Sequence, residues 1–173
     1  DYTNLENGSI TVEALRRLAD MPKKRIGSLV VNPGGPGASG IDYAYNAEYV
    51  FSPDILDRYD IVGFDPRGVS RSTPIKCYND AETDANYAAD AKPDNAKELA
   101  QSVKDSANFI KKCGSKTKNL TAFSTANAAR DMDILRSLLG DKKLNYMGKS
   151  YGTFMGTLYA QLFPNNVGAM VLD

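Results

Sequence analysis

The sequence has 173 residues, of which 42% are apolar and 24% charged, as in soluble globular proteins, and it is long enough for one domain with a buried core. Its 21 basic and 21 acidic side chains balance to a formal net charge of zero, so nothing in the charge predicts a nucleic acid or an anionic membrane as a partner. No apolar run approaches the length of a membrane-spanning helix, so no membrane span is predicted.

Five segments are predicted to be strands. The first, residues 10–18 (ITVEALRRL), mixes strand-like alternation with helix-like spacing, and we interpret it as a strand because the turn-forming Asn7-Gly8-Ser9 precedes it. The other four are short and mostly apolar, as expected for strands buried on both faces of a parallel sheet. They are residues 27–31 (GSLVV), 59–64 (YDIVGF), 144–147 (LNYM) and 167–172 (VGAMVL).

Helical patterns lie between these strands. Residues 39–49 show a weak pattern, residues 125–139 show the clearest one and stop at Gly140, and residues 153–163 end before Pro164. Strands that alternate with helices predict an α/β fold, in which an open, mostly parallel sheet is covered by helices on both faces.

A fourth helix is predicted in the most polar third of the chain. Residues 96–112 carry apolar side chains at helical spacing, with Asp94 as the expected N-cap and Gly114 just past the expected end. The preceding residues 78–95 are rich in Ala, Asp and Asn, and we interpret them as a surface excursion rather than a domain linker.

The two cysteines, Cys77 and Cys113, flank this polar segment. No histidine accompanies them and their spacing is wide, so no metal site is predicted. They are either two free thiols or a disulfide, and we favour the disulfide because residues 78–112 have little apolar surface to hold them in place. Closing that loop would contribute roughly 3–4 kcal/mol. A disulfide would also imply an oxidising, extracytoplasmic setting, so we expect a secreted or cell-wall-associated protein.

Three unusual sequences follow predicted strands: NPGGPGASG (32–40), FDPRGVSRS (64–72) and GKSYG (148–152). In an open parallel sheet, ligands bind at the carboxyl ends of the strands. Because all three sequences occur at such ends, they indicate a single active edge.

The pentapeptide 148–152 has the G-x-S-x-G pattern of a nucleophile elbow, a tight strand-to-helix turn that exposes a catalytic serine. Gly148 and Gly152 are required where the turn brings backbone too close for a β-carbon. Ser150 is then the nucleophile, and the Tyr151 N–H at the helix start is an oxyanion donor. The alternatives are a glycine-flanked serine in a phosphate-binding turn and a Ser–Lys dyad with Lys149, which we expect to face solvent.

The glycine-rich sequence 32–40 is predicted to supply the second oxyanion donor. Pro36 has no N–H, so the donor should be Gly35 or, as the weaker choice, Gly34. A dinucleotide fingerprint is the alternative, but the G-x-G-x-x-G spacing is missing and the prolines at 33 and 36 do not suit a helix start. No cofactor is predicted.

The polar residues of the sequence 64–72 are predicted to be structural. We expect an Asp–Arg pair among Asp65, Arg67, Arg71 and Ser72 to order the loop beside the pocket. The chain contains no histidine, although a serine hydrolase normally needs an imidazole to accept the serine proton. Asp173 follows the last strand, where a triad acid could lie, but there is no histidine for it to orient.

These motifs, with LYAQLFP and VGAMVLD after the elbow, resemble the α/β-hydrolase family of secreted actinobacterial tripeptidyl aminopeptidases, relatives of the prolyl aminopeptidases. The resemblance covers nearly the whole chain. It implies that Ser150 is the nucleophile and that Gly35 and Tyr151 are the oxyanion donors. Asn32 stands where prolyl aminopeptidases usually carry histidine, and Ser70 replaces a usual glycine. The cysteines suit exported family members, which have a disulfide in the corresponding excursion.

The resemblance also implies what is missing. The family's acid and histidine lie further on, beyond a mostly helical cap whose acidic groups capture the free N-terminus of a peptide substrate. Family members are more than twice as long. We therefore expect residues 1–173 to be the N-terminal portion of one α/β-hydrolase domain, with a surface excursion at about 77–120.

The expected function is that of a serine exopeptidase that releases short peptides through an acyl-enzyme. The chain should be inactive alone and should need a C-terminal segment or a partner chain to supply the cap, the acid and the histidine. The alternatives are an esterase or lipase, and a non-catalytic binding or scaffold domain.

Overall fold

The computed structural model describes residues 2, 6 and 8–173, so Asn7, which opens the turn predicted before the first strand, lies outside the described residues. The chain forms two compact units. Unit 1 comprises residues 1–74 and 122–173 and contains the sheet, while unit 2 comprises residues 75–121 and is helical. No helix in the described part of the chain is long and apolar enough to cross a lipid bilayer.

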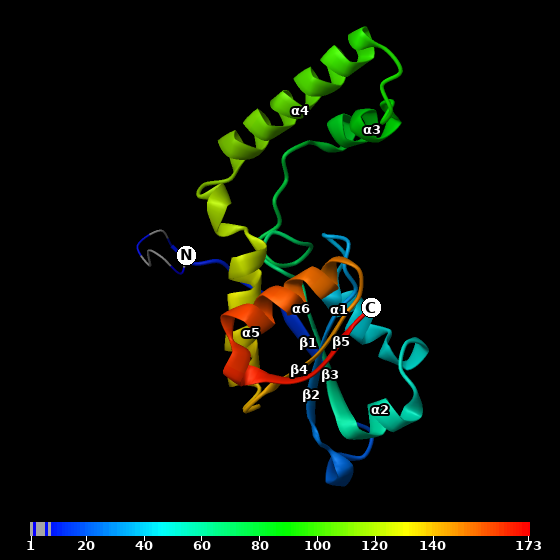
Figure 1. Cartoon of the computed structure of the whole chain (residues 1–173), viewed down its shortest axis with the longest axis vertical. Coiled ribbons are helices and arrows are strands. Elements are labelled where there is room, and N and C mark those ends of the chain that lie inside the picture. The colour runs from blue at the N-terminus through cyan, green and yellow to red at the C-terminus, as the bar shows by residue number, and fades with distance from the viewer. Residues whose placement is uncertain (1, 3–5, 7) are drawn as a thin grey trace. The chain divides into compact units, whose positions relative to one another are not determined.

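Unit 1 is built on a five-stranded sheet with the order β1-β3-β2-β4-β5 (Figure 1). Only β1 runs antiparallel to its neighbour β3, and the other pairs are parallel. The mostly parallel sheet predicted from the apolar runs is therefore confirmed. The strands are β1 (Ala14–Arg17), β2 (Gly27–Asn32), β3 (Tyr59–Phe64), β4 (Leu144–Gly148) and β5 (Val167–Leu172).

The first strand is shorter than predicted from residues 10–18. Its ladder with β3 starts where Ala14 pairs with Phe64, and β3 ends there. Before that point the backbone bonds to loop side chains instead, because the N–H of Glu13 donates to Ser72 Oγ at 2.8 Å and that of Thr11 donates to Thr73 Oγ1 at 3.1 Å. These side chains bind the backbone N–H groups that precede β1, because β3 does not extend past Phe64 to pair with them.

Helices cover both faces of the sheet, as predicted. One face packs Val30, Val62 and Tyr146 against residues of α5 and α6, such as Met132 and Met155. The other face packs Val31 and Ile61 against Ala44 of α1 and Leu56 of α2. The helices of unit 1 are α1 (Gly40–Tyr45), α2 (Pro53–Arg58), α5 (Thr125–Leu138) and α6 (Tyr151–Leu162), with 3₁₀ turns at Pro22–Lys24, Ala47–Tyr49, Leu120–Ala122 and Pro164–Asn166.

Two helices of unit 1 differ from their predicted extents. Helix α1 ends at Tyr45, and a 3₁₀ turn over Ala47–Tyr49 completes the segment that was predicted as one helix. Helix α2 was not predicted, although Pro53 at its first turn and Asp54 beside it are typical of a helix start. Its six residues are too few for an apolar period to show.

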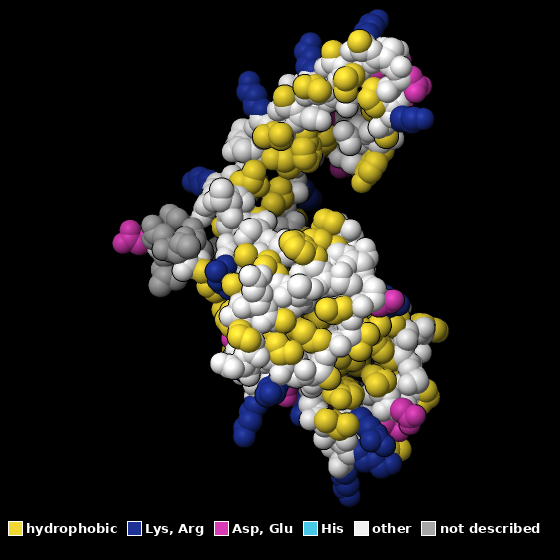
Figure 2. Space-filling view, in the orientation of Figure 1, with side chains coloured by type: hydrophobic (Ala, Val, Ile, Leu, Met, Phe, Trp, Pro, Cys, Tyr) yellow, Lys and Arg dark blue, Asp and Glu magenta, His cyan; other side chains and the backbone are white. Residues whose placement is uncertain are grey.

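Unit 2 consists of α3 (Asp80–Ala88) and α4 (Ala96–Lys116), joined by the disulfide between Cys77 and Cys113. The disulfide predicted from the sequence is confirmed. Within the described residues 75–121, these two cysteines are the only buried side chains. Figure 2 shows apolar side chains along α4. The apolar side chains of this helix include Val103 and Ile110, which remain more than half exposed. The disulfide is therefore the centre of a very small core.

Three predictions for unit 2 are wrong in detail. Asn95, not Asp94, caps α4, because its side chain accepts hydrogen bonds from the N–H groups of Lys97 and Glu98. Helix α4 also continues through Gly114 to Lys116, whose Nζ donates to the carbonyl oxygen of Cys77 at 2.9 Å and so ties down the last turn. Helix α3 lies inside the segment interpreted as a surface excursion, where no helix was predicted, and its signal is the capping box that joins Asn79 and Glu82.

Candidate active site

The three glycine-rich or charged sequences follow β2, β3 and β4, so they lie at the carboxyl edge of the sheet. In the register of β2 with β4, Asn32 pairs with Gly148, and the N–H of Lys149 donates to the carbonyl oxygen of Asn32 at 3.0 Å. A β-carbon on Gly34 would lie 2.4 Å from the carbonyl oxygen of Lys149 and 3.0 Å from the β-carbon of Ser150. The loop after β2 therefore packs directly on the elbow after β4.

The elbow itself holds Ser150 in an unusual conformation. Its φ of 51° and ψ of −119° place a non-glycine residue at positive φ, which costs free energy and is typical of functional sites. The N–H of Ser150 donates to the carbonyl oxygen of Asp173 at 2.7 Å, and its own carbonyl accepts from the N–H of Thr153 at 2.9 Å. The side chain of Ser150 is exposed. The turn thus presents a serine hydroxyl at the start of α6.

The two elbow glycines lie where backbone segments meet. A β-carbon on Gly148 would lie 2.4 Å from the carbonyl oxygen of Gly152, and one on Gly152 would lie 2.9 Å from that of Asn32. The buried hydroxyl of Tyr146 also donates to the Gly152 carbonyl at 2.8 Å. Only glycine allows this crossing of β4, α6 and the loop after β2.

Two backbone N–H groups have no acceptor within the described structure, that of Tyr151 in the elbow and that of Gly35, which follows the Gly34 packed on the elbow. Tyr151 opens the 12-residue helix α6, so the helix dipole adds positive potential at its N–H. The N–H of Gly34 differs, because it donates to Asn32 Oδ1 at 2.9 Å. Of the two predicted donors in this loop, only Gly35 has an N–H that remains available for an oxyanion.

The carboxylate of Asp65 connects the loop after β3 to the loop after β2. Asp65 is fully buried, and it accepts hydrogen bonds from Ser39 Oγ at 2.6 Å, from the N–H of Ile41 at 3.3 Å and from the N–H of Arg71 at 3.1 Å. Burial raises the pKa of this carboxyl, but these hydrogen bonds outweigh burial and hold the pKa below its ordinary value. Asp65 is therefore an anion fixed between two loops.

The predicted Asp–Arg pair is present as a long contact of 3.6 Å between Asp65 and Arg71, whose guanidinium also pairs with Asp42 at 2.9 Å. Arg67 has a different partner. It forms a bidentate pair with Asp131, at 2.7 and 2.6 Å, and donates to the carbonyl oxygen of Ala122 at 2.7 Å. It joins this loop to the turn before α5 and to the middle of that helix, rather than ordering the loop around Asp65.

Lys149 and Asp173 lie beside the elbow without forming part of a proton relay. The Lys149 ammonium is 3.7 Å from Asp173 Oδ2, and both side chains are well exposed. Within the described residues, Lys149 makes no hydrogen bond to the Ser150 hydroxyl, so the Ser–Lys dyad receives no support.

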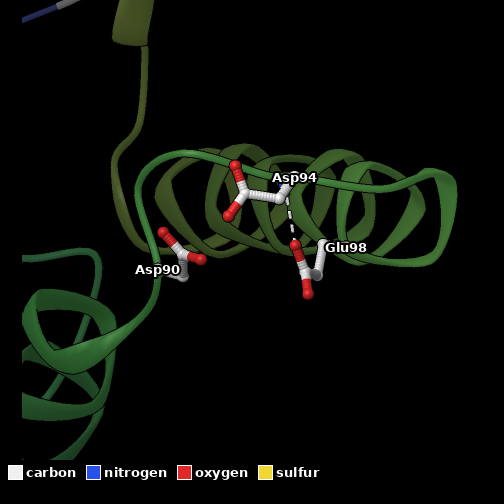
Figure 3. Close-up of side chains that lie close together, drawn as sticks. All are labelled: Asp90, Asp94 and Glu98. Atoms are coloured by element: carbon white, nitrogen blue, oxygen red, sulfur yellow. Dashed lines mark hydrogen bonds between the residues drawn. The ribbon is translucent and has the colours of Figure 1, made fainter.

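A group of three carboxylates lies elsewhere, in unit 2. Asp90, Asp94 and Glu98 bring one oxygen each within 4.8 Å of one another (Figure 3). All three are exposed, and the N–H of Asp94 donates to Glu98 Oε2 at 2.8 Å, which closes the turn before α4. This turn explains the cluster without an ion.

Sequence reasoning missed how the loop after β2 is held. The Asn32 side chain was noted only as a departure from a related family, yet it occupies the Gly34 N–H. The contact between Ser39 and Asp65 joins residues 26 positions apart, and no local pattern indicates such a pair.

Known proteins with similar sequences are hydrolases. The chain is 43% identical over 171 residues to the serine protease Hip1 of Mycobacterium tuberculosis. The aligned region covers 96% of this chain and 32% of that protein. It is 40% identical over 154 residues to the tripeptidyl aminopeptidase of Streptomyces lividans, covering 87% and 28%. It is 45% identical over 163 residues to carboxylesterase B of M. tuberculosis, covering 87% and 30%. The chain thus spans about a third of the length of these relatives.

A solved structure of a marine microorganism esterase has the same fold, with a TM-score of 0.52 at 13% identity over 95% of this chain and 41% of that one. A family model for the alpha/beta hydrolase fold matches residues 27–173. The resemblance inferred from the motifs is confirmed, and the chain belongs to the alpha/beta hydrolase fold family.

Proposed function

We propose that this chain carries the nucleophile and the oxyanion hole of a serine exopeptidase. The observation that carries the proposal is the exposed Ser150 at positive φ, followed by the acceptor-free N–H of Tyr151 and packed against the loop whose Gly35 N–H also has no acceptor in the described structure. Ser150 Oγ attacks the carbonyl carbon of a peptide bond, and the carbonyl oxygen takes up the electron pair as an oxyanion. The two N–H groups stabilise that oxyanion. It collapses to an acyl-enzyme and releases the amine, whose nitrogen takes the proton that the general base had accepted from Ser150. Water then hydrolyses the ester.

The general base must come from residues outside these 173. The sequence has no histidine, and the relatives are about three times as long. We propose that a further segment supplies a histidine to accept the Ser150 proton, an acid to orient it, and a cap that receives the substrate N-terminus. The 173 residues alone would then be inactive. The disulfide supports an oxidising, extracytoplasmic location.

A fluorophosphonate probe tests this proposal in the full-length protein. The probe forms a covalent bond to an activated serine, so we expect labelling of the wild type and none of Ser150→Ala. Ser9→Ala is the matched control, because it removes an exposed serine hydroxyl remote in sequence from the elbow. A wild type that stays unlabelled, or Ser150→Ala labelled at the wild-type rate, would contradict the proposal. Hydrolysis by residues 1–173 alone would contradict the external base.

An esterase is the second candidate, and the 45% identity to a carboxylesterase supports it. The same elbow and oxyanion donors serve an ester as well as an amide, so they do not separate the two activities. The comparison that separates them is kcat/KM for a tripeptide p-nitroanilide with a free N-terminus against kcat/KM for a p-nitrophenyl ester. An exopeptidase should lose activity when the tripeptide N-terminus is acetylated, whereas an esterase should not discriminate in this way.

A further inference from the structure

The loop that carries Gly35, residues 33–39, contains three glycines, and only Pro33 and Pro36 restrict φ within it through their rings. Gly34, Gly35 and Gly37 all have positive φ, at 96°, 107° and 109°, which glycine visits freely but does not favour over other conformations. Its internal backbone hydrogen bond, from the N–H of Ala38 to the carbonyl oxygen of Gly34, is long at 3.3 Å. The position of the Gly35 N–H must therefore be set by the residues that hold the two ends of the loop.

At its first end, the loop is held by hydrogen bonds to Asn32, the last residue of β2. Asn32 accepts the Lys149 N–H on its carbonyl oxygen and the Gly34 N–H on its side chain. Both bonds fix the backbone up to Gly34, directly beside Ser150, but they leave the following residues unconstrained.

At its second end, the loop is held by β3 and the residue after it. A β-carbon on Gly40 would lie 2.1 Å from the carbonyl oxygen of Phe64, so the two backbones are in contact. The next residue, Asp65, accepts the hydroxyl of Ser39 and the N–H of Ile41 on the same oxygen, Oδ1. Its other oxygen, Oδ2, accepts the Arg71 N–H. One buried carboxylate thus clamps the loop end to the sheet.

The Arg71 side chain contributes less than the Asp65 carboxylate. The Arg71 side chain is 51% exposed, and its pair with Asp42 lies at the surface, where water and salt weaken ion pairs. The Asp65 side chain has no exposed area, so an oxygen that lost its donor could not be rescued by solvent.

We propose that Asp65 is a positioning residue for the oxyanion hole: by fixing Ser39, it sets the place of the Gly35 N–H relative to Ser150. The inference rests on the proposed function. The oxyanion exists only after attack, so a displaced donor weakens binding of the transition state and not of the substrate. A defect at Asp65 should therefore lower kcat and leave KM unchanged.

Asp65→Asn in the full-length enzyme tests this, with Asp60→Asn as the matched control. Asp60 is also buried on β3 and accepts hydrogen bonds from Arg16, Arg25 and the Ala19 N–H, but it lies near the other end of the strand. Both substitutions replace a buried, hydrogen-bonded carboxylate by an amide, so both should destabilise. We expect only Asp65→Asn to lower kcat for p-nitrophenyl acetate, by about 10-fold to 100-fold at unchanged KM.

A second pair of variants separates positioning from folding. Ser39→Ala removes the hydroxyl that donates a hydrogen bond to Asp65, so kcat should fall. Ser39→Thr keeps a hydroxyl there, so kcat should stay near the wild-type value. Hydrogen exchange of the amides in residues 33–39 should be faster in Asp65→Asn and Ser39→Ala than in Asp60→Asn. Equal kcat for Asp65→Asn and Asp60→Asn, or unchanged exchange in this loop, would overturn the inference.

The wild-type control separates this inference from the proposed function. If fluorophosphonate labels wild-type Ser150 but Asp65→Asn reacts as fast as Asp60→Asn, the positioning role is wrong and the proposed function stands. If wild-type Ser150 is never labelled, the proposed function fails and the positioning role falls with it.

Discussion

The backbone N–H of Ser150 donates a 2.7 Å hydrogen bond to the carbonyl oxygen of Asp173, and the N–H of Asp173 donates at 2.9 Å to the carbonyl oxygen of Gly148. The residue after β5 therefore continues the parallel ladder along the elbow. Its backbone supports the turn that presents the serine. The Asp173 side chain is different, because it is 68% exposed and, among residues 2, 6 and 8–173, its carboxylate pairs only with the Lys149 ammonium, at 3.7 Å.

This separation of backbone and side chain predicts different results for two substitutions of Asp173. Asp173→Ala removes an exposed ion pair, so it should change the free energy of unfolding by less than about 1 kcal/mol. Asp173→Pro removes the donor to the buried Gly148 carbonyl and should cost about 1–3 kcal/mol. Urea denaturation of both variants measures the difference. Equal losses would mean that the carboxylate, not the backbone, supports the elbow.

Asp173→Ala also tests whether Asp173 is the triad acid. Under the proposed function the acid lies outside these 173 residues, so Asp173→Ala should keep the wild-type rate of fluorophosphonate labelling at Ser150. A drop of about 10³-fold or more, comparable to loss of a triad member, would assign that role to Asp173 instead.

The sheet and most of its helices could be predicted because their signals are local. An apolar run such as residues 27–31 is buried on both faces in any parallel sheet, and the glycine pattern of the elbow is a recognisable five-residue motif, although Gly152 also lies against the distant Asn32 carbonyl. The limits of β1 could not be predicted, because they depend on where β3 stops and on Ser72 accepting the Glu13 N–H. Those partners are distant in sequence.

The active edge was predicted from motifs, but the hydrogen bonds that join its loops were not. The resemblance to the aminopeptidase family implied a glycine at the position of Ser70, and the φ of 44° found there is one that glycine adopts without strain. Asp65 was expected to pair with an arginine, whereas its shortest hydrogen bond is to Ser39 on another loop. A polar contact between two loops leaves no periodic trace in the sequence.

The close packing of the loop after β2 on the elbow predicts a large effect of Gly34→Ala. A β-carbon there would lie 2.4 Å from the Lys149 carbonyl oxygen, at a φ of 96° that side chains rarely adopt. Overpacking and backbone strain together should cost about 2 kcal/mol or more, and labelling of Ser150 should slow as the loop moves. Thermal unfolding and fluorophosphonate kinetics measure the two effects.

Gly114→Ala is the control for that substitution. Gly114 lies within α4, and a β-carbon there would have no heavy atom within 4 Å. Because alanine favours a helix over glycine, this variant should be more stable by about 0.5–1 kcal/mol, with unchanged labelling. Similar losses in the two glycine variants would contradict the packing argument.

Acid should destabilise unit 1 through Asp133. The hydrogen bond from Arg136 lowers the pKa of this carboxyl, burial raises it, and hydrogen bonds from Asn166 and Tyr159 lower it further, so the folded pKa lies below the ordinary value of about 3.9. A carboxyl with a depressed folded pKa stabilises the fold above its unfolded pKa, and that contribution disappears as the pH falls through the folded pKa. Urea midpoints between pH 7 and pH 2 should therefore fall below about pH 4, less steeply in Asp133→Asn. Parallel curves would contradict this.

The disulfide should control the folding of unit 2 independently of unit 1. Among the described residues 75–121 only Cys77 and Cys113 are buried, so little apolar surface opposes unfolding once the bond is removed. Closing a loop of 36 residues contributes about 4 kcal/mol in the chain-entropy picture. In a double Cys77→Ala and Cys113→Ala variant, hydrogen exchange should therefore become fast throughout α3 and α4 while the strands β2, β3 and β4 stay protected. Retained protection of α4 would mean that the contact of Tyr78 with Phe109 and the ion pair of Lys112 with Glu82 suffice without the disulfide.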